Sequence, residues 1–245
     1  QSMERILLLG AGKIGRAICK FLCQTGDYEL VVGDASDEAL ARLEGIPHAT
    51  TCRLDVEEAS DLASVMTGCR AVISALSFSH NSLVAEAALA AGASYFDLTE
   101  DVETSRKVTA LAAGAAPSQI FMPQCGLAPG FVSIVSNDLA QRLDEIDTIK
   151  MRVGALPLYP SNSLKYNLTW STDGLINEYC NPCEAIHNGA YAETLALEGF
   201  EHFSVDGVSY EAFNTSGGLG TLCNTFEGQV QHLNYKTVRY PGHRE

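Results

Sequence analysis

Three glycines near the start of the chain have the spacing of a turn that holds a phosphate-containing ligand. Gly10, Gly12 and Gly15 follow the apolar run at residues 6–9, and a helix-compatible stretch at residues 16–22 comes next. A helix start offers free backbone N–H groups and a positive dipole end, and glycines lack the Cβ that would keep a diphosphate away. We therefore expect the main chain to bind a pyrophosphate. The alternative is a tight turn that only packs a helix against a strand.

An acidic residue at the end of the second strand-like run extends this expectation. Residues 29–33 form the run and Asp34 ends it, at the offset where a carboxylate accepts hydrogen bonds from the adenosine ribose of a dinucleotide. A carboxylate there repels a 2′-phosphate, so the sequence favours NAD and leaves NADP open, because Arg42 lies nearby. The cofactor contacts expected from the glycine turn and the strand ends are Gly10, Gly12, Lys13, Ile14, Gly15, Asp34, Asp55, Val56, Ala75, Leu76 and Ser77.

Acidic residues also gather after the fifth predicted strand. Asp97, Glu100 and Asp101 fall within residues 97–101, close to where a nicotinamide is expected to lie. Glu100 and Asp101 have an equally good explanation as residues that cap the next helix and favour its dipole. Asp97 stands at the strand end itself, so we predict it as the catalytic carboxylate.

The elements that must position these residues alternate between strand and helix. Continuous apolar strands suit a parallel sheet covered on both faces, and six strands complete a dinucleotide-binding domain. The sequence thus predicts an α/β, Rossmann-type doubly wound parallel sheet over residues 1–145. The strands are expected at residues 6–9, 29–33, 50–54, 71–75, 94–97 and 120–122, and the helices at 16–22, 57–66, 82–91 and 102–113.

The pattern changes after residues 126–130, and a second, smaller α+β domain is expected over residues 146–245. A helix at residues 132–143 leads to an alternating strand at residues 148–153. Asn188-Gly189 and Asp206-Gly207 each lie between strand-like runs, which is the strongest short-range signal for an antiparallel hairpin. A short helix is expected at residues 175–180, with Ser171 as its N-cap.

Composition limits the classes of partner. The chain has 245 residues and a formal net charge of −14 with only 16 Lys and Arg, which argues against nucleic acid and anionic membranes and favours a cationic amine substrate. Its eight cysteines are scattered, so reduced thiols in the cytoplasm are expected. No metal site is expected, because Cys180 and Cys183 lack a second ligand pair. Gln1 and Ser2 resemble a tag remnant.

Five segments carry a likeness to a known family. They are residues 10–15 (Gly-Ala-Gly-Lys-Ile-Gly), 95–99 (Tyr-Phe-Asp-Leu-Thr), 125–130 (Cys-Gly-Leu-Ala-Pro-Gly), 154–157 (Gly-Ala-Leu-Pro) and 166–171 (Tyr-Asn-Leu-Thr-Trp-Ser). Together they resemble the saccharopine dehydrogenase family, including its lysine 6-dehydrogenase branch, over nearly the whole chain. The resemblance implies an NAD(P)-dependent oxidoreductase, expected as a homodimer, that acts on the carbon–nitrogen bond of saccharopine or lysine.

The resemblance also implies roles for residues at matching positions, with the substrate held between the two domains. Substrate contacts would come from Cys125, Gly126, Tyr166, Thr169 and Trp170. Hydride loss from an amine requires a base, for which Asp97 and Lys165 are predicted. A substrate carboxylate needs a cation or backbone donors, which Lys165, Arg152 or Arg239 would supply.

Two departures from the family pattern suggest an alternative function. Ser77 stands where family members usually have proline, and members continue well beyond residues 241–243, so the chain is expected to be truncated at its C-terminus. The alternative is a non-catalytic NAD(H)-binding sensor or regulatory protein.

Overall fold

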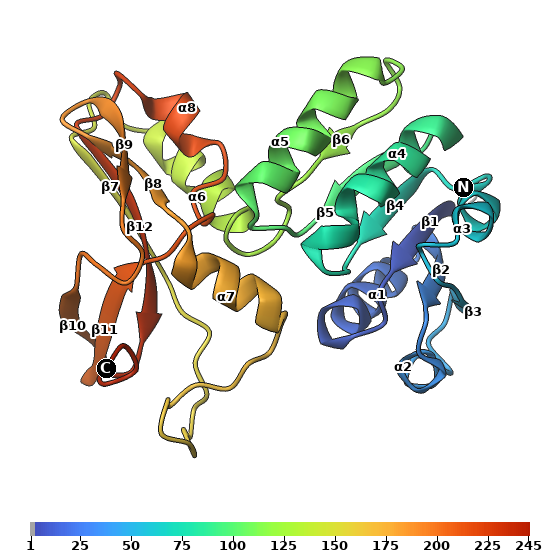
Figure 1. Ribbon diagram of the computed structural model, residues 1–245, viewed down its shortest axis with the longest axis horizontal. Coiled ribbons are helices and arrows are strands. Elements are labelled where there is room, and N and C mark those ends of the chain that lie inside the picture. Colours follow the sequence, from blue (N-terminus) through green and yellow to red (C-terminus); the bar gives the residue numbers. More distant parts are fainter. Residues whose placement is uncertain (1–2) are drawn as a thin grey trace. The chain divides into compact units, whose positions relative to one another are not determined.

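The computed structural model describes residues 3–245, which fall into two compact units (Figure 1). Unit 1 extends to Thr99 and continues from Glu103 to Cys125, and unit 2 contains Glu100–Val102 and Gly126–Glu245. Gln1 and Ser2, the expected tag remnant, lie outside the described residues. No helix among residues 3–245 is long and apolar enough to cross a membrane.

Unit 1 is built on a six-stranded parallel sheet in the order β3-β2-β1-β4-β5-β6, which confirms the predicted Rossmann-type fold. The order reverses between β1 and β4, so the carboxyl ends of those two strands form the edge where such sheets bind ligands. The strands are β1 (Glu4–Leu9), β2 (Tyr28–Asp34), β3 (Ala49–Arg53), β4 (Ala71–Ser74), β5 (Ser94–Asp97) and β6 (Phe121–Met122).

Both faces of this sheet are buried under helices. Along β1, Leu7 and Leu9 belong to one hydrophobic cluster, whereas Ile6 and Leu8 belong to another, as the two-residue period of a strand requires. The helices are α1 (Lys13–Thr25), α2 (Asp37–Ala41), α3 (Ala59–Met66), α4 (Asn81–Ala91) and α5 (Val102–Leu111), with short 3₁₀ turns η1 (Phe78–His80) and η2 (Ala112–Gly114).

Unit 2 contains a second sheet, in the order β10-β11-β12-β8-β9, with β7 paired to β12. β7 runs parallel to β12 and the other pairs are antiparallel, so the predicted second α+β fold is confirmed. Its strands are β7 (Thr148–Val153), β8 (Cys183–His187), β9 (Ala190–Thr194), β10 (Glu201–Val205), β11 (Val208–Asn214) and β12 (His232–Arg239), and its helices are α6 (Phe131–Ala140), α7 (Thr172–Cys180) and α8 (Leu222–Phe226).

Two tight turns connect β8 to β9 and β10 to β11, where the sequence predicts them. Asn188 and Gly189 have φ values of 51° and 81°, and Asp206 and Gly207 have φ values of 51° and 78°. Positive φ at both central residues matches the right-handed twist of the flanking strands. These two dipeptides therefore fix the register of both hairpins.

The chain passes from unit 1 to unit 2 between Cys125 and Gly126, whereas the sequence pattern predicts the domain boundary after residue 145. The segment between these positions contains α6. Val132 and Ala140 of this helix pack with Met151 and Leu222, which lie in unit 2. Helix α6 is therefore part of the core of unit 2.

Gly15→Ala tests the packing of α1 against β1. The added Cβ would lie 1.8 Å from the carbonyl oxygen of Gly10, which cannot move aside as a side chain can. Overpacking costs about 1–3 kcal/mol where side chains adjust, so we expect a loss of about 3 kcal/mol or more in urea unfolding. Gly12→Ala is the matched control, because its Cβ would have nothing within 4 Å, and we expect a loss below about 1 kcal/mol. Equal losses would contradict this account.

Candidate functional site

The three glycines of the turn between β1 and α1 have different surroundings. Gly10 has φ of 98°, and a Cβ there would lie 2.8 Å from the carbonyl oxygen of Ala75. Gly15 is equally enclosed, as described above, whereas Gly12 has open space around the position of its Cβ. Two glycines thus allow tight packing, and the middle one lets a ligand approach the backbone.

Helix α1 begins at this open position. Gly12 is its N-cap residue, and no side chain caps the helix there. Its first turn contains Lys13 and Ile14 and carries no acidic residue. The positive end of the helix dipole therefore faces the turn without a competing carboxylate in the helix, which suits an anionic ligand.

Asp34 lies at the end of β2, and its carboxylate joins that strand to the glycine turn. Oδ2 accepts a hydrogen bond from the backbone N–H of Ala11 at 2.7 Å, and Oδ1 accepts one from Ser36 at 2.8 Å. These bonds hold a negative charge beside the glycine turn. Two arginines near this strand end already have acidic partners, because Arg42 pairs with Glu38 and Arg53 pairs with Asp37.

The remaining predicted cofactor residues of unit 1 follow β3 and β4. Asp55 is exposed, and its carboxylate accepts a hydrogen bond from the backbone N–H of Glu57 at 3.0 Å. Val56 packs against the core. After β4, Ala75 and Leu76 lie against the glycine turn, and Ser77 follows them. The structure thus brings the predicted cofactor residues to the carboxyl ends of β1 to β4.

Asp97 ends β5 and is completely buried. Its carboxylate accepts hydrogen bonds from the Tyr95 hydroxyl at 2.7 Å and from the backbone N–H groups of Gln124 at 2.9 Å and Thr99 at 3.0 Å. Burial raises the pKa of Asp97, and these three bonds oppose the increase. A carboxylate so enclosed can hold the loop after β6, and the role of Asp97 as a base stays a prediction.

Cys125 is the exposed residue next to this buried carboxylate. Its backbone N–H donates to the carbonyl oxygen of Asp97 at 2.8 Å, and its thiol lies 3.2 Å from the carbonyl oxygen of Met122. Desolvation, followed by the negative charge of Asp97, raises the pKa of the thiol to about 11. Cys125 is therefore a neutral hydrogen-bond donor near pH 7 rather than a thiolate nucleophile.

Lys165 and the other predicted substrate residues lie in unit 2. The Lys165 Nζ is exposed and donates to the carbonyl oxygen of Pro241 at 2.8 Å. Trp170 donates from Nε1 to the Tyr166 hydroxyl at 3.1 Å, and both residues are at least partly buried. Thr169 is exposed, and Gly126 forms an isolated bridge with Gly130.

A buried charged cluster in unit 2 contains residues that no sequence motif connects. Arg239 of β12 is 4% exposed, lies 4.2 Å above the Tyr166 ring, and donates from Nε to the Tyr179 hydroxyl at 3.1 Å. Glu178 of α7 and Glu100 are also buried. Burial, followed by the charge of Glu100, raises the pKa of Glu178 to about 8. No spacing signal identifies this cluster, because its members come from separate elements.

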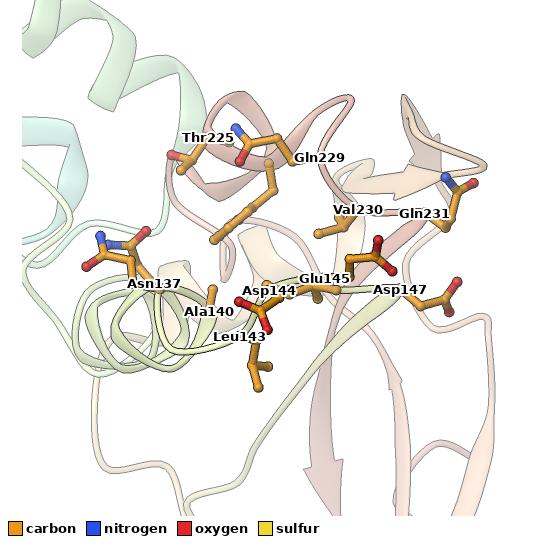
Figure 2. A pocket seen from close by; sticks show the side chains of 13 residues that line it. Asn137, Ala140, Leu143, Asp144, Glu145, Asp147, Thr225, Gln229, Val230 and Gln231 are labelled. Carbon is orange, nitrogen blue, oxygen red and sulfur yellow. Dashed lines mark hydrogen bonds between the residues drawn. The ribbon is translucent and has the colours of Figure 1, made fainter.

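Unit 2 also has a cavity of about 580 Å³ (Figure 2). It lies between α6, α8 and the segment that follows α6, and its lining includes Asp144, Glu145 and Asp147. None of the predicted site residues lines it. The lining of the cavity therefore shares no residue with the candidate coenzyme and substrate sets.

Two family models match adjoining parts of the chain. The model described as the saccharopine dehydrogenase NADP binding domain matches residues 6–120. The model described as the saccharopine dehydrogenase C-terminal domain matches residues 126–245. The second match starts at Gly126, where the chain enters unit 2 for the remainder of its length.

Individual proteins similar to this chain come from the same family. A saccharopine dehydrogenase [NADP(+), L-glutamate-forming] from Schizosaccharomyces pombe is 25% identical over 198 residues, which cover 78% of this chain and 44% of that protein. The apo saccharopine dehydrogenase (L-Glu forming) from Saccharomyces cerevisiae superposes with a TM-score of 0.76 at 19% identity, over 99% of this chain and 56% of that one. The chain thus spans about half the length of these relatives.

A further similar structure shares the fold at greater distance. The myo-inositol dehydrogenase from Corynebacterium glutamicum superposes with a TM-score of 0.54 at 15% identity, over 98% of this chain and 70% of that one. At this identity, the similarity concerns the arrangement of the elements alone.

Asp97→Asn tests whether the buried carboxylate holds the loop. An amide has one acceptor oxygen, so at least one of the three donors loses its partner inside the protein. A buried group left without a partner costs about 1–3 kcal/mol, and we expect this loss in urea unfolding. Asp55→Asn, at an exposed carboxylate that also accepts one backbone N–H, is the control and should change stability by less than about 0.5 kcal/mol. Wild-type stability of Asp97→Asn would contradict the proposed role.

Proposed function

Because the chain belongs to the saccharopine dehydrogenase family, we propose that it transfers a hydride between a nicotinamide dinucleotide and the carbon–nitrogen bond of a lysine-derived amino acid, saccharopine or lysine. The observation that carries this proposal is the glycine turn of unit 1. Gly12 is open at an uncapped helix start, and Gly10 and Gly15 are enclosed by backbone atoms. This combination suits a pyrophosphate held against the main chain.

The residues of unit 1 position the coenzyme and one wall of the reaction site. The start of α1 would hold the pyrophosphate, and Asp34 would accept hydrogen bonds from the adenosine ribose. The bound nicotinamide supplies the position that accepts or donates the hydride. Asp97 holds the loop that presents the Cys125 thiol, which stays protonated near neutral pH and can donate a hydrogen bond to the substrate.

Oxidation of the substrate requires removal of a proton from its amine. The carbon that bears the nitrogen loses a hydride, the nitrogen loses a proton, and the resulting imine is hydrolysed to a carbonyl compound and a free amine. Lys165 is our proposed proton acceptor, acting through its neutral amine, because its side chain is exposed and Asp97 is enclosed. Tyr166, Thr169 and Trp170 belong to the same segment and are proposed to contact the substrate.

The choice between the two coenzymes depends on opposing indications. The names of the matched domain model and of the fission yeast relative favour NADP. The fixed carboxylate of Asp34 disfavours a 2′-phosphate, because two like charges about 4 Å apart at a protein surface repel by about 4 kcal/mol before screening by salt. The proposed site therefore accepts a nicotinamide dinucleotide, and Asp34 lowers its affinity for the phosphorylated form.

Asp34→Asn tests this effect of charge. We expect the affinity for NADPH relative to NADH to rise at least about tenfold, or about 1.4 kcal/mol, because the amide removes the repulsion. Fluorescence titration with both reduced coenzymes measures the ratio. Glu44→Gln removes an exposed charge outside the predicted coenzyme contacts and should change the ratio by less than about threefold. An unchanged ratio in Asp34→Asn would exclude Asp34 as a determinant of coenzyme choice.

A substrate panel tests the proposed reaction. We expect saccharopine or lysine to drive reduction of the coenzyme, measured by nicotinamide absorbance, with no comparable signal from glutamate or from aliphatic alcohols. Gly12→Asp places a carboxylate at the open glycine and should abolish both coenzyme binding and turnover. Saturable coenzyme binding without turnover of any amine would contradict the proposed reaction and leave the coenzyme site intact.

A further inference from the structure

A short segment after β5 belongs to unit 2, although the residues on both sides of it belong to unit 1. This segment, Glu100–Val102, is called the strap here, and it lies between Thr99 and Glu103 of unit 1. The strap is therefore held by contacts different from those of its neighbours in the chain.

Two glycines of unit 2 enclose Glu100. A Cβ on Gly174 of α7 would lie 2.8 Å from Oε1 of Glu100 and 2.3 Å from the Trp170 ring. A Cβ on Gly217 would lie 2.1 Å from the backbone oxygen of Glu100. A side chain at Gly217 would therefore meet the backbone of the strap, whereas one at Gly174 would meet the Glu100 carboxyl group and the Trp170 ring.

Further contacts join the strap and α7 to the segment that contains Gly217. Asn177 donates from its amide to the Asp101 carboxylate at 3.3 Å. Ser216 donates its backbone N–H to the carbonyl oxygen of Glu178 at 2.9 Å, and its hydroxyl lies 3.3 Å from the carbonyl oxygen of Asn177. The strap, α7 and the loop at residues 216–217 are thus connected. The part of α7 from Gly174 to Glu178 and this loop are together called the seat of the strap.

The strap and its seat contain two buried carboxyl groups, on Glu100 and Glu178. The ionisable groups that act on Glu178 from the elements around it are Glu100 of the strap, Arg239 and Tyr235 of β12, Cys183 of β8, and Tyr179 of its own helix. Arg239 carries the positive charge of this set, and its Nε bonds to the Tyr179 hydroxyl. Burial, followed by the charge of Glu100, raises the pKa of Glu178 to about 8, and Arg239 partly offsets that increase.

The strap is covalently next to the residues that hold Asp97. Glu100 follows Thr99 directly, and the backbone N–H of Thr99 donates to the Asp97 carboxylate at 3.0 Å. The same carboxylate oxygen accepts the N–H of Gln124, next to Cys125. The strap thus begins at the residue directly after the amide that fixes this carboxylate.

We propose that Glu178 is a positioning residue, which must carry a proton for the strap to seat between Gly174 and Gly217 and so hold Asp97 and the Cys125 loop in place. Seating takes up a proton from solvent, and release of the strap returns it. The inference rests on the proposed function for its consequence in catalysis, but the seating equilibrium can be measured without coenzyme or substrate.

The direction in which pH changes the seating of the strap follows from the difference in protons bound by the seated and released states. The seated state keeps the proton up to about pH 8, whereas an exposed glutamate loses it near its usual pKa of 4.5. Between these values the released state binds fewer protons, so seating weakens as pH rises, by up to about tenfold per pH unit. Above about pH 8 Glu178 is ionised in both states, and its effect on seating becomes constant.

Hydrogen exchange of the strap amides, corrected for the intrinsic rate, tests the proposal between about pH 5 and pH 8. We expect protection in the wild type to fall across this range, by up to about tenfold per pH unit. In Glu178→Gln, which is neutral at every pH, protection should stay constant. Asp173→Asn makes the same chemical change at an exposed position of α7 and should retain the wild-type decline.

Wild-type protection that does not change with pH would overturn the proposal, whether or not Glu178→Gln folds. An equal decline in the wild type and in folded Glu178→Gln would also overturn it. Gly217→Ala supplies a second variant, in which the strap should lose protection at every pH, because the added Cβ would lie 2.1 Å from the backbone oxygen of Glu100. Retained protection in folded Gly217→Ala would contradict the close approach of the strap to Gly217. Failure of hydride transfer would leave these measurements unaffected.

Discussion

The close approach of two backbone segments in the first turn is the constraint on which the coenzyme site depends. Gly15 can lie against the carbonyl oxygen of Gly10 only because it has no side chain, and Gly10 in turn lies against Ala75. This contact sets where α1 begins and joins it to the ends of β1 and β4. Gly12 is left open at the helix start, so the same packing that stabilises the fold leaves backbone N–H groups accessible to an anion.

Three aspartates at or just after the carboxyl ends of β2, β3 and β5 form the same local hydrogen bond. Asp34, Asp55 and Asp97 each accept a hydrogen bond from the backbone N–H two residues later, at 2.8, 3.0 and 3.0 Å. Asp34 and Asp97 also each bind the N–H of a distant loop. The aspartates therefore shape the loops that leave the sheet before they meet any ligand. Acidity at a strand end is consistent with ligand binding, but burial decides whether the carboxylate is available for it.

The sequence predicts the elements better than it predicts the environment of the site. Apolar strands and two dipeptides with left-handed geometry are local signals, and both sheets and both hairpins follow from them. Helix α2 was not predicted, because its five residues give too short a pattern. The burial of Asp97 depends on Gln124, far along the chain, and the Glu178 cluster depends on three separate segments. Such contacts have no periodic pattern in the sequence.

The surroundings of the basic side chains in unit 2 indicate which of them is available to contact the substrate. Arg152 binds both carboxylate oxygens of Glu201 at 2.9 Å, and Lys236 binds the same carboxylate at 2.6 Å. Arg239 is buried against two tyrosine rings. Lys165 differs, because its exposed Nζ donates to a neutral carbonyl oxygen, and exchange of that contact for a substrate group separates no ion pair. Of the three basic side chains predicted to contact the substrate, Lys165 is therefore the one that can turn to the substrate amine without breaking an ion pair or leaving a buried site.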